Sequence, residues 1–184
     1  MRVKHEVIYL WPPAGVDINN INNTAQVLVD VPNQNNLFVL DGASHITISG
    51  FKFTEVYGLD AVIIKNSSYC TFSDNEIYAP ERRGLTVIVY DGQDCNNIVI
   101  ERNTISYAGD SGIYVGGSVK SSSIVNNHIH HCADENKYCA GIEFPFYGIT
   151  ASDVNEYAYT DDILIAHNWI HDMPRDGIQL GANP

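Results

Sequence analysis

The feature that most constrains the fold of this sequence is an internal repeat. The clearest copy spans residues 94–118, where two short apolar runs flank a polar corner and the triplet Asn103-Thr104-Ile105. The triplet pattern begins at residues 51, 75, 103, 127 and 168, so successive copies start 24, 28, 24 and 41 residues apart. Self-similarity at such a period indicates a stacked repeat architecture.

Two more columns of the repeat agree with this interpretation. An apolar residue stands three positions before each triplet, at Ile48, Phe72, Ile100, Ile124 and Ile165. A glycine follows four triplets, nine residues later at Gly84, Gly112 and Gly177, and at Gly141 after five extra residues. No segment sustains the spacing of an amphipathic helix, so we expect short strands in each repeat. We therefore predict an all-β fold, a right-handed single-stranded parallel β-helix with coils of about 24 residues.

Four of the triplets begin with asparagine, at Asn75, Asn103, Asn127 and Asn168. In stacked coils, each side-chain amide can donate a hydrogen bond to the asparagine of one neighbouring coil and accept one from the other side. Asparagine also tolerates the left-handed backbone of a tight corner. We therefore predict an asparagine ladder, with a structural rather than a catalytic role for these residues.

The chain is short enough to be a single domain. We predict entry coils over residues 1–43 and regular coils over residues 44–184, interrupted by an inserted loop at residues 144–160. The apolar run after the first residues is too short and too polar for a signal peptide. The sequence ends directly after a predicted strand, without a capping element. Because solenoids need capped ends, we expect the sequence to be an excerpt of a longer protein.

The formal net charge of −12 limits the binding partners that we expect. Nucleic acid requires a basic surface, so no nucleic-acid partner is expected. No apolar stretch is long enough to insert into a membrane. The abundance of Asn, Ser, Thr, Tyr and Gly suits neutral, hydroxyl-rich ligands. Cys132 and Cys139 bracket a short loop and could close it with a disulfide in an oxidising compartment, although four cysteines do not describe a disulfide scaffold.

Four segments carry a resemblance to a known family: 9–13 (YLWPP), 40–51 (LDGASHITISGF), 126–131 (NNHIHH) and 166–172 (AHNWIHD). With these segments the sequence resembles bacterial right-handed parallel β-helix proteins of carbohydrate degradation, in particular the β-helix glycoside hydrolases that include family 141. The resemblance implies a secreted, periplasmic or cell-surface enzyme that acts on a polysaccharide or oligosaccharide. It also implies catalytic carboxylates on one face of the β-helix, without identifying them.

The repeat alignment places three acidic residues on neighbouring coils: Asp110, Glu143 and Asp176. Stacked coils lie about 4.8 Å apart, so one column of the alignment becomes a row of neighbouring side chains. Glycosidases use two carboxyl groups, about 5–5.5 Å or 6.5–9.5 Å apart, and both separations are available here. We predict these three residues as catalytic. The alternative is that Asp110 and Asp176 are turn residues bonded to their own backbone, and that Glu143 is structural.

The same alignment places imidazoles beside the acids, with His130 next to His171 and His131 next to Asp172. Three interpretations stay open for this group: structural filling, substrate binding, and metal ligation with an aspartate oxygen as a further donor. We predict substrate binding and no metal site. The full set of predicted substrate-binding residues is Tyr114, His130, His131, His171, Asp172, Arg175 and Gln179.

Two other functions remain alternatives to a glycoside hydrolase, for which no cofactor is expected. A polysaccharide lyase would need an Arg or Lys base and a cation such as Ca²⁺, which acidic clusters could hold. A non-catalytic carbohydrate-binding or surface β-helix would use the same columns as a docking strip. We interpret Arg82 and Arg83 mostly as solvated corner residues, expect Trp169 to point outward, and expect the aromatic 144–160 loop to cover the carboxylate row.

Overall fold

The computed structural model describes residues 36–54, 56–90, 93–133, 139–145 and 160–181, all within one compact unit. These residues form 17 strands and no helix. Residues 1–35, with most of the predicted entry coils, and residues 146–159 of the predicted inserted loop lie outside the described residues.

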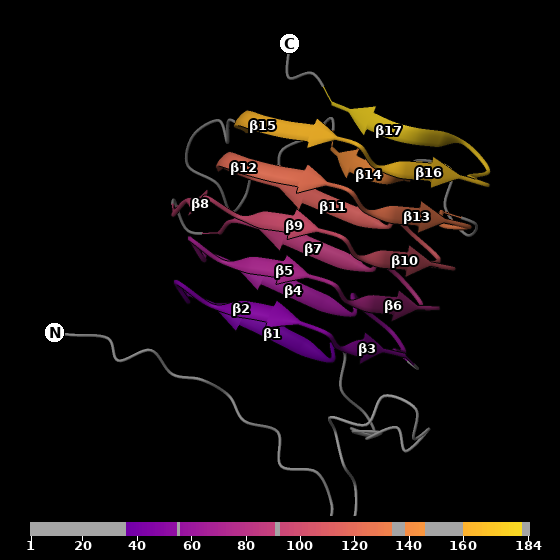
Figure 1. Ribbon diagram of the computed structural model, residues 1–184, viewed down its shortest axis with the longest axis horizontal. Helices are drawn as coiled ribbons and strands as arrows, with labels where there is room; N and C mark the ends of the chain where they lie inside the picture. The colour runs from indigo at the N-terminus through magenta and orange to yellow at the C-terminus, as the bar shows by residue number, and fades with distance from the viewer. Residues whose placement is uncertain (1–35, 55, 91–92, 134–138, 146–159, 182–184) are drawn as a thin grey trace, which may run out of the picture. The chain divides into compact units, whose positions relative to one another are not determined.

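The strands build three parallel sheets, and each complete coil contributes a strand to each sheet (Figure 1). Sheet 1 contains β1 (Phe38–Asp41), β4 (Val62–Lys65), β7 (Leu85–Ile88), β11 (Ile113–Gly116), β14 (Ala140–Phe144) and β17 (Asp176–Leu180). Sheet 2 contains β2 (Thr47–Ser49), β5 (Thr71–Ser73), β9 (Val99–Glu101), β12 (Val119–Val125) and β15 (Asp161–Ala166), and β8 (Cys95–Asn96) also pairs with β12. Sheet 3 contains β3 (Lys52–Phe53), β6 (Glu76–Tyr78), β10 (Thr104–Ser106), β13 (His128–His130) and β16 (Trp169–His171).

The strand register confirms the predicted repeat. Ile105 pairs with Ile77 on one side and with Ile129 on the other, and these three side chains are fully buried. The apolar column before the triplets is also in register, from Ile48 on β2 to Ile165 on β15. Side chains of a strand alternate between two faces, so each column fills one layer of the interior. The predicted parallel solenoid is therefore confirmed.

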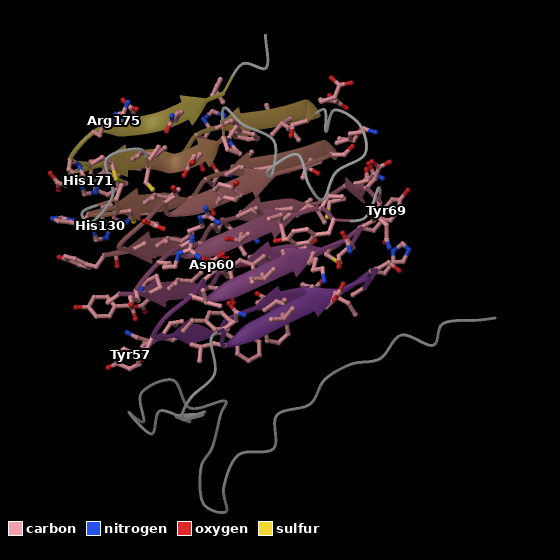
Figure 2. The ribbon with its side chains drawn as sticks, turned by 180° about the vertical axis from the view of Figure 1, so that it is seen from behind. Tyr57, Asp60, Tyr69, His130, His171 and Arg175 are labelled. Carbon is pink, nitrogen blue, oxygen red and sulfur yellow. The ribbon has the colours of Figure 1, made fainter. Side chains whose placement is uncertain are left out.

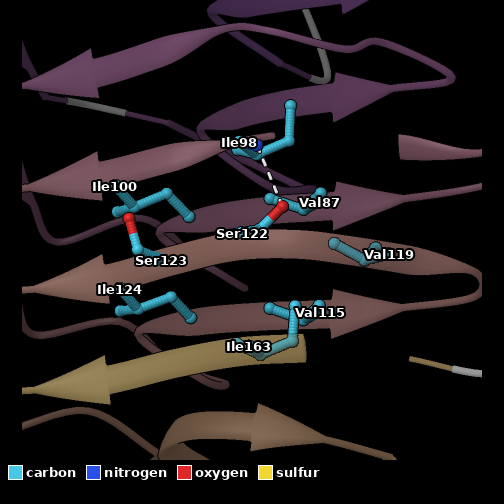
Figure 3. A pocket seen from close by; sticks show the side chains of 9 residues that line it. All are labelled: Val87, Ile98, Ile100, Val115, Val119, Ser122, Ser123, Ile124 and Ile163. Carbon is cyan, nitrogen blue, oxygen red and sulfur yellow. Dashed lines mark hydrogen bonds between the residues drawn. The ribbon is translucent and has the colours of Figure 1, made fainter. Parts of the chain in front are cut away.

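A pocket inside the stack belongs to this apolar interior (Figure 3). It is lined by Val87, Ile98, Ile100, Val115, Val119, Ser122, Ser123, Ile124 and Ile163. The Ser122 hydroxyl accepts a hydrogen bond from the Ile98 backbone N–H (2.9 Å) and donates one to the Lys120 carbonyl (2.8 Å). The Ser122 hydroxyl is thus satisfied within the protein, and no acid or base lines the pocket.

The predicted asparagine ladder is present and buried. The backbone N–H and the side-chain Nδ2 of Asn103 both donate to Asn127 Oδ1, at 3.0 Å each. Asn103 Nδ2 also donates to the Phe72 carbonyl of the preceding coil (2.9 Å). Asn75 and Asn168 extend the same pattern to either side. One carboxamide per coil therefore donates a hydrogen bond to a backbone carbonyl of the coil before it and another to the asparagine of the coil after it.

We expected the left-handed backbone of this corner at the ladder asparagines. It lies instead at the residue before each of them. Those residues are Gly50, Asp74, Arg102, Asn126 and His167, with φ between 53° and 78°. The left-handed residue turns the chain, and the following asparagine can then place its amide inside the corner. The conformational requirement and the hydrogen-bonding requirement thus fall on two adjacent positions.

The glycine column marks the closest approach between neighbouring coils. A Cβ on Gly112 would lie 2.6 Å from Ile129 Cγ2 and 2.8 Å from the Gly141 carbonyl oxygen. At Gly177, on the last described coil, the nearest atom would be Ile170 Cγ2 at 3.6 Å, an ordinary contact. The column therefore requires glycine inside the stack but tolerates a methyl group at its end.

Replacing Asn103 by Leu should destabilise the fold by about 1–3 kcal/mol, because the ladder neighbours lose their buried partners. Denaturant unfolding of this variant measures the loss, with Thr104→Leu as the control at the adjacent, partly exposed position. Equal unfolding free energies for Asn103→Leu and the wild type would contradict an energetic role for the ladder.

Gly112→Ala should destabilise the protein by about 1–3 kcal/mol, because the added methyl group overpacks the contact between coils. Gly177→Ala is the matched control and should change the unfolding free energy much less, since its methyl group has room. A similar loss in both variants would show that the close approach at Gly112 is not the cause.

Candidate functional site

The outward side of sheet 1 carries the column in which Glu143 was predicted. Strand register places Ile63, Thr86, Tyr114, Glu143 and Gln179 side by side, and we call this set the outer row. Tyr114 is 8% exposed and Glu143 is 9% exposed. The central side chains of the outer row are therefore largely shielded and do not line an open groove.

A second polar row runs beside the outer row and was not recognised from the sequence. Each member stands two positions before a residue of sheet 1, and those sheet-1 residues pair with one another in register. We call this set the entry row, and it consists of Asp60, Arg83, Ser111, Ala140 and Asp176. The available signal was positional, because each of these residues directly precedes Ala61 or one of the column glycines.

The two rows meet through diagonal contacts, each joining the entry row of one coil to the outer row of the next. The contacting pairs are Asp60–Thr86, Arg83–Tyr114 and Ser111–Glu143. The Thr86 hydroxyl donates a 2.6 Å hydrogen bond to Asp60 Oδ2. The Arg83 guanidinium lies 3.6 Å from the centroid of the Tyr114 ring, a favourable cation–π distance. Our interpretation of Arg83 as a solvated corner residue was therefore wrong.

Glu143 combines shielding with a polar environment. Burial raises the pKa of this carboxyl above its ordinary value of 4.5, and the nearby charge of Asp110 raises it further. A hydrogen bond from the Ser111 hydroxyl and the charge of Arg83 act in the opposite direction. The net effect is a raised pKa, so Glu143 keeps its proton to a higher pH than an exposed glutamate and can serve as an acid.

The other two predicted acids have different surroundings. Asp110 is 14% exposed, its Oδ2 lies 3.3 Å from Arg82 Nε, and its charge acts on Glu143. Asp176 is 41% exposed and pairs with Arg175 at 3.2 Å. Asp176 also stands in register with Ala140, one position nearer to the glycine column than Asp110. The charge of Asp110 thus acts on Glu143, whereas Asp176 lies at the surface with its arginine.

The predicted imidazole group forms a connected network on sheet 3 and the following corner. His128 Nε2 lies 2.8 Å from His171 Nε2, and His130 Nδ1 lies 2.8 Å from His131 Nδ1. Asp172 Oδ2 lies 2.8 Å from His171 Nδ1. His128 was not among the predicted site residues, although its position two before His130 places both side chains on one face of the strand. Within the described residues, the contacts of this network do not extend to Glu143.

The rings of this network stack along the direction in which the coils repeat. His130 and His171 are parallel within 7° at 5.2 Å, and His128 and Trp169 are parallel within 7° at 4.3 Å. Each of these rings therefore stacks on a ring of the neighbouring coil. Trp169 points outward as expected and is 63% exposed. Figure 2 shows His130 and His171 near one side of the stack and Tyr69 near the opposite side.

With the fold and these two groups of side chains described, a comparison with protein families identifies the chain. Residues 36–184 match the family described as "Right handed beta helix region". The chain belongs to the right-handed β-helix family. This confirms the predicted fold and its handedness. Neither a curated protein nor a solved structure matches the chain.

The cysteines of this β-helix are buried free thiols, so the structure does not contain the disulfide that Cys132 and Cys139 could form in an oxidising compartment. Cys132 Sγ lies against the carbonyls of Ile105 (3.9 Å) and His130 (3.4 Å). Burial raises the pKa of the Cys139 thiol to about 11, with Asp110 contributing in the same direction. The two thiols therefore pack in the interior as small apolar groups.

Two further findings concern the described part of this β-helix. No three of its His, Cys, Asp and Glu side chains are arranged so as to hold a metal ion. None of its segments is a helix long and apolar enough to cross a membrane.

The imidazole network should make the stability of this β-helix depend on pH. Burial and the neighbouring imidazoles lower the pKa of His128 and of His130 from their ordinary value of 6.5. Each histidine then binds fewer protons in the folded than in the unfolded chain. Its contribution to the free energy of unfolding is therefore complete above about pH 6.5 and is lost as the pH falls through the folded pKa.

Denaturant unfolding between about pH 7.5 and pH 5 should therefore show a falling unfolding free energy. The pH dependence should be weaker in the double variant His128→Gln, His130→Gln. Staying above pH 5 limits the contribution of Asp172, whose pKa is lowered by its hydrogen bond with His171 and affects stability at more acidic pH. Identical slopes in the variant and the wild type would contradict this assignment.

Proposed function

We propose that this β-helix degrades a glycan as a glycoside hydrolase, with Glu143 and Asp110 as the two carboxyl groups. The observation that carries the proposal is the shielded Glu143 carboxyl with its raised pKa, next to a second acid that is held by an arginine. Two carboxyl groups in unlike environments are the usual arrangement for acid and base roles in glycoside hydrolysis. The resemblance to β-helix glycoside hydrolases supports the same reaction class.

The two environments support a division of roles. Glu143 donates its proton to the glycosidic oxygen, and the Ser111 hydroxyl holds Glu143 Oε2 in place. Asp110, paired with Arg82, is the second carboxyl group and either attacks the anomeric carbon or activates a water molecule. A product of retained configuration would assign Asp110 as the nucleophile, and an inverted product would assign it as the base. Asp176, at the surface with Arg175, is the alternative second carboxylate.

Elimination from an acidic glycan is a second candidate, and one observation favours it. Arg83 places a cation over Tyr114, beside Glu143, where it could neutralise a sugar carboxylate or assist a base. A lyase releases unsaturated products that absorb in the ultraviolet, whereas a hydrolase releases only new reducing ends. A panel of neutral and acidic polysaccharides scored with both readouts separates the two reactions.

Glu143→Gln should lower kcat by about 100- to 10,000-fold, the usual contribution of a general acid. The loss should be small for aryl glycosides whose leaving group needs no proton, which separates an acid role from misfolding. Asp110→Asn should lower kcat on both kinds of substrate. Asp94→Asn, which removes an exposed acid paired with Lys120, is the control.

Asp176→Asn decides between the two candidates for the second carboxylate. Full activity in Asp110→Asn together with an inactive Asp176→Asn would move the role to Asp176. Full activity in folded Glu143→Gln, Asp110→Asn and Asp176→Asn would end the proposal of a carboxylate mechanism at this site.

A further inference from the structure

The diagonal contacts between the entry row and the outer row stop at Ala140. In the preceding coils each entry-row side chain reaches the outer-row residue of the next coil, ending with the Ser111 hydroxyl and Glu143 Oε2. The next pair by the same rule is Ala140 and Gln179, since Ala140 continues the column of Ser111 and Gln179 pairs in register with Glu143. Alanine has no group that can hydrogen-bond, so this contact cannot form.

At this position Gln179 carries an unsatisfied acceptor. Its Oε1 atom is buried and has no hydrogen-bond partner among the side chains and backbone groups described. A buried amide oxygen without a donor is unfavourable, and such groups are uncommon in native structures. The residue as a whole is only half-buried, and the terminal torsion of a glutamine amide is soft, so the amide can turn to meet a donor.

We propose that Gln179, left unpaired by Ala140, is a subsite that accepts a hydrogen bond from a hydroxyl group of a neutral sugar unit beside Glu143. The inference rests on the proposed function, because it names what the same site binds. A hydroxyl supplies the donor that Gln179 Oε1 lacks. A sugar carboxylate has no proton to donate at neutral pH, so it cannot make this hydrogen bond. The subsite therefore favours a sugar unit that turns a hydroxyl group, rather than a carboxylate, toward Gln179.

The variant Ala140→Ser tests this subsite by completing the missing contact. A serine there repeats the geometry of Ser111 in the coil before, so its hydroxyl should donate to Gln179 Oε1 and occupy the acceptor. We expect a melting temperature a few degrees higher and glycan binding about tenfold weaker, the effect of one hydrogen bond. Ala140→Gly, which adds no donor, is the matched control and should bind like its parent.

Binding is measured by affinity electrophoresis of the full chain in the Glu143→Gln background, so that the glycan is not consumed. The probes are xylan, glucomannan, galactomannan and mixed-linkage β-glucan, with polygalacturonate as the acidic comparison. The inference is supported if a neutral glycan binds and Ala140→Ser weakens it. It is overturned if none of the neutral probes binds, if polygalacturonate binds better, or if Ala140→Ser is stabilised and binds unchanged.

Gln179→Leu decides the test if Ala140→Ser fails to fold or is not stabilised. It removes the acceptor and should weaken binding of the same neutral glycan to a similar extent, without loss of stability. Unchanged binding in Gln179→Leu overturns the subsite. Glycan that binds but is never cleaved by the wild type would refute the hydrolase proposal and leave the subsite standing, so the two failures are distinguishable.

Discussion

The buried asparagine ladder is the interaction on which the rest of this β-helix depends. Asn127 Oδ1 accepts hydrogen bonds from both the backbone and the side chain of Asn103, so one oxygen joins two coils at two points. If two neighbouring coils slipped by one residue, these groups would be left unpaired in a dry corner, and the shifted register would not restore their hydrogen bonds. The ladder thereby sets the register of all three sheets, and with it the rows of side chains that face outward.

Those rows explain which parts of the molecule could be predicted from the sequence. Columns such as Ile77, Ile105 and Ile129 repeat one residue type, and a repeated type is visible in the sequence. The entry row has no common type, since Arg83, Ser111 and Ala140 differ in charge, size and polarity. Its existence follows from register alone. The diagonal reach of each side chain to the next coil depends on rotamers, which spacing does not reveal.

Asp110 and Asp176 show the same limit of sequence-based prediction at the level of a single residue. Asp110 stands two residues before its glycine and Asp176 stands one residue before its own, and the alignment treated them as equivalent. In a coil corner, that single residue decides whether a side chain meets Arg82 near Glu143 or lies at the surface with Arg175. For the same reason, the left-handed backbone lies one position before each ladder asparagine rather than at the asparagine itself. Corner geometry changes with every residue, whereas strand geometry repeats every second one.

A solenoid tolerates such local departures because each coil contacts only its neighbours. The diagonal contacts at Asp60, Arg83 and Ser111 each join one coil to the next, so the absence of such a contact at Ala140 affects stability only where it occurs. The ladder of asparagines and the stacked rings of sheet 3 hold the same coils together on other sides. A shielded acid and an unsatisfied amide can therefore stand side by side at Glu143 and Gln179, because the register that places them is maintained elsewhere in the coil.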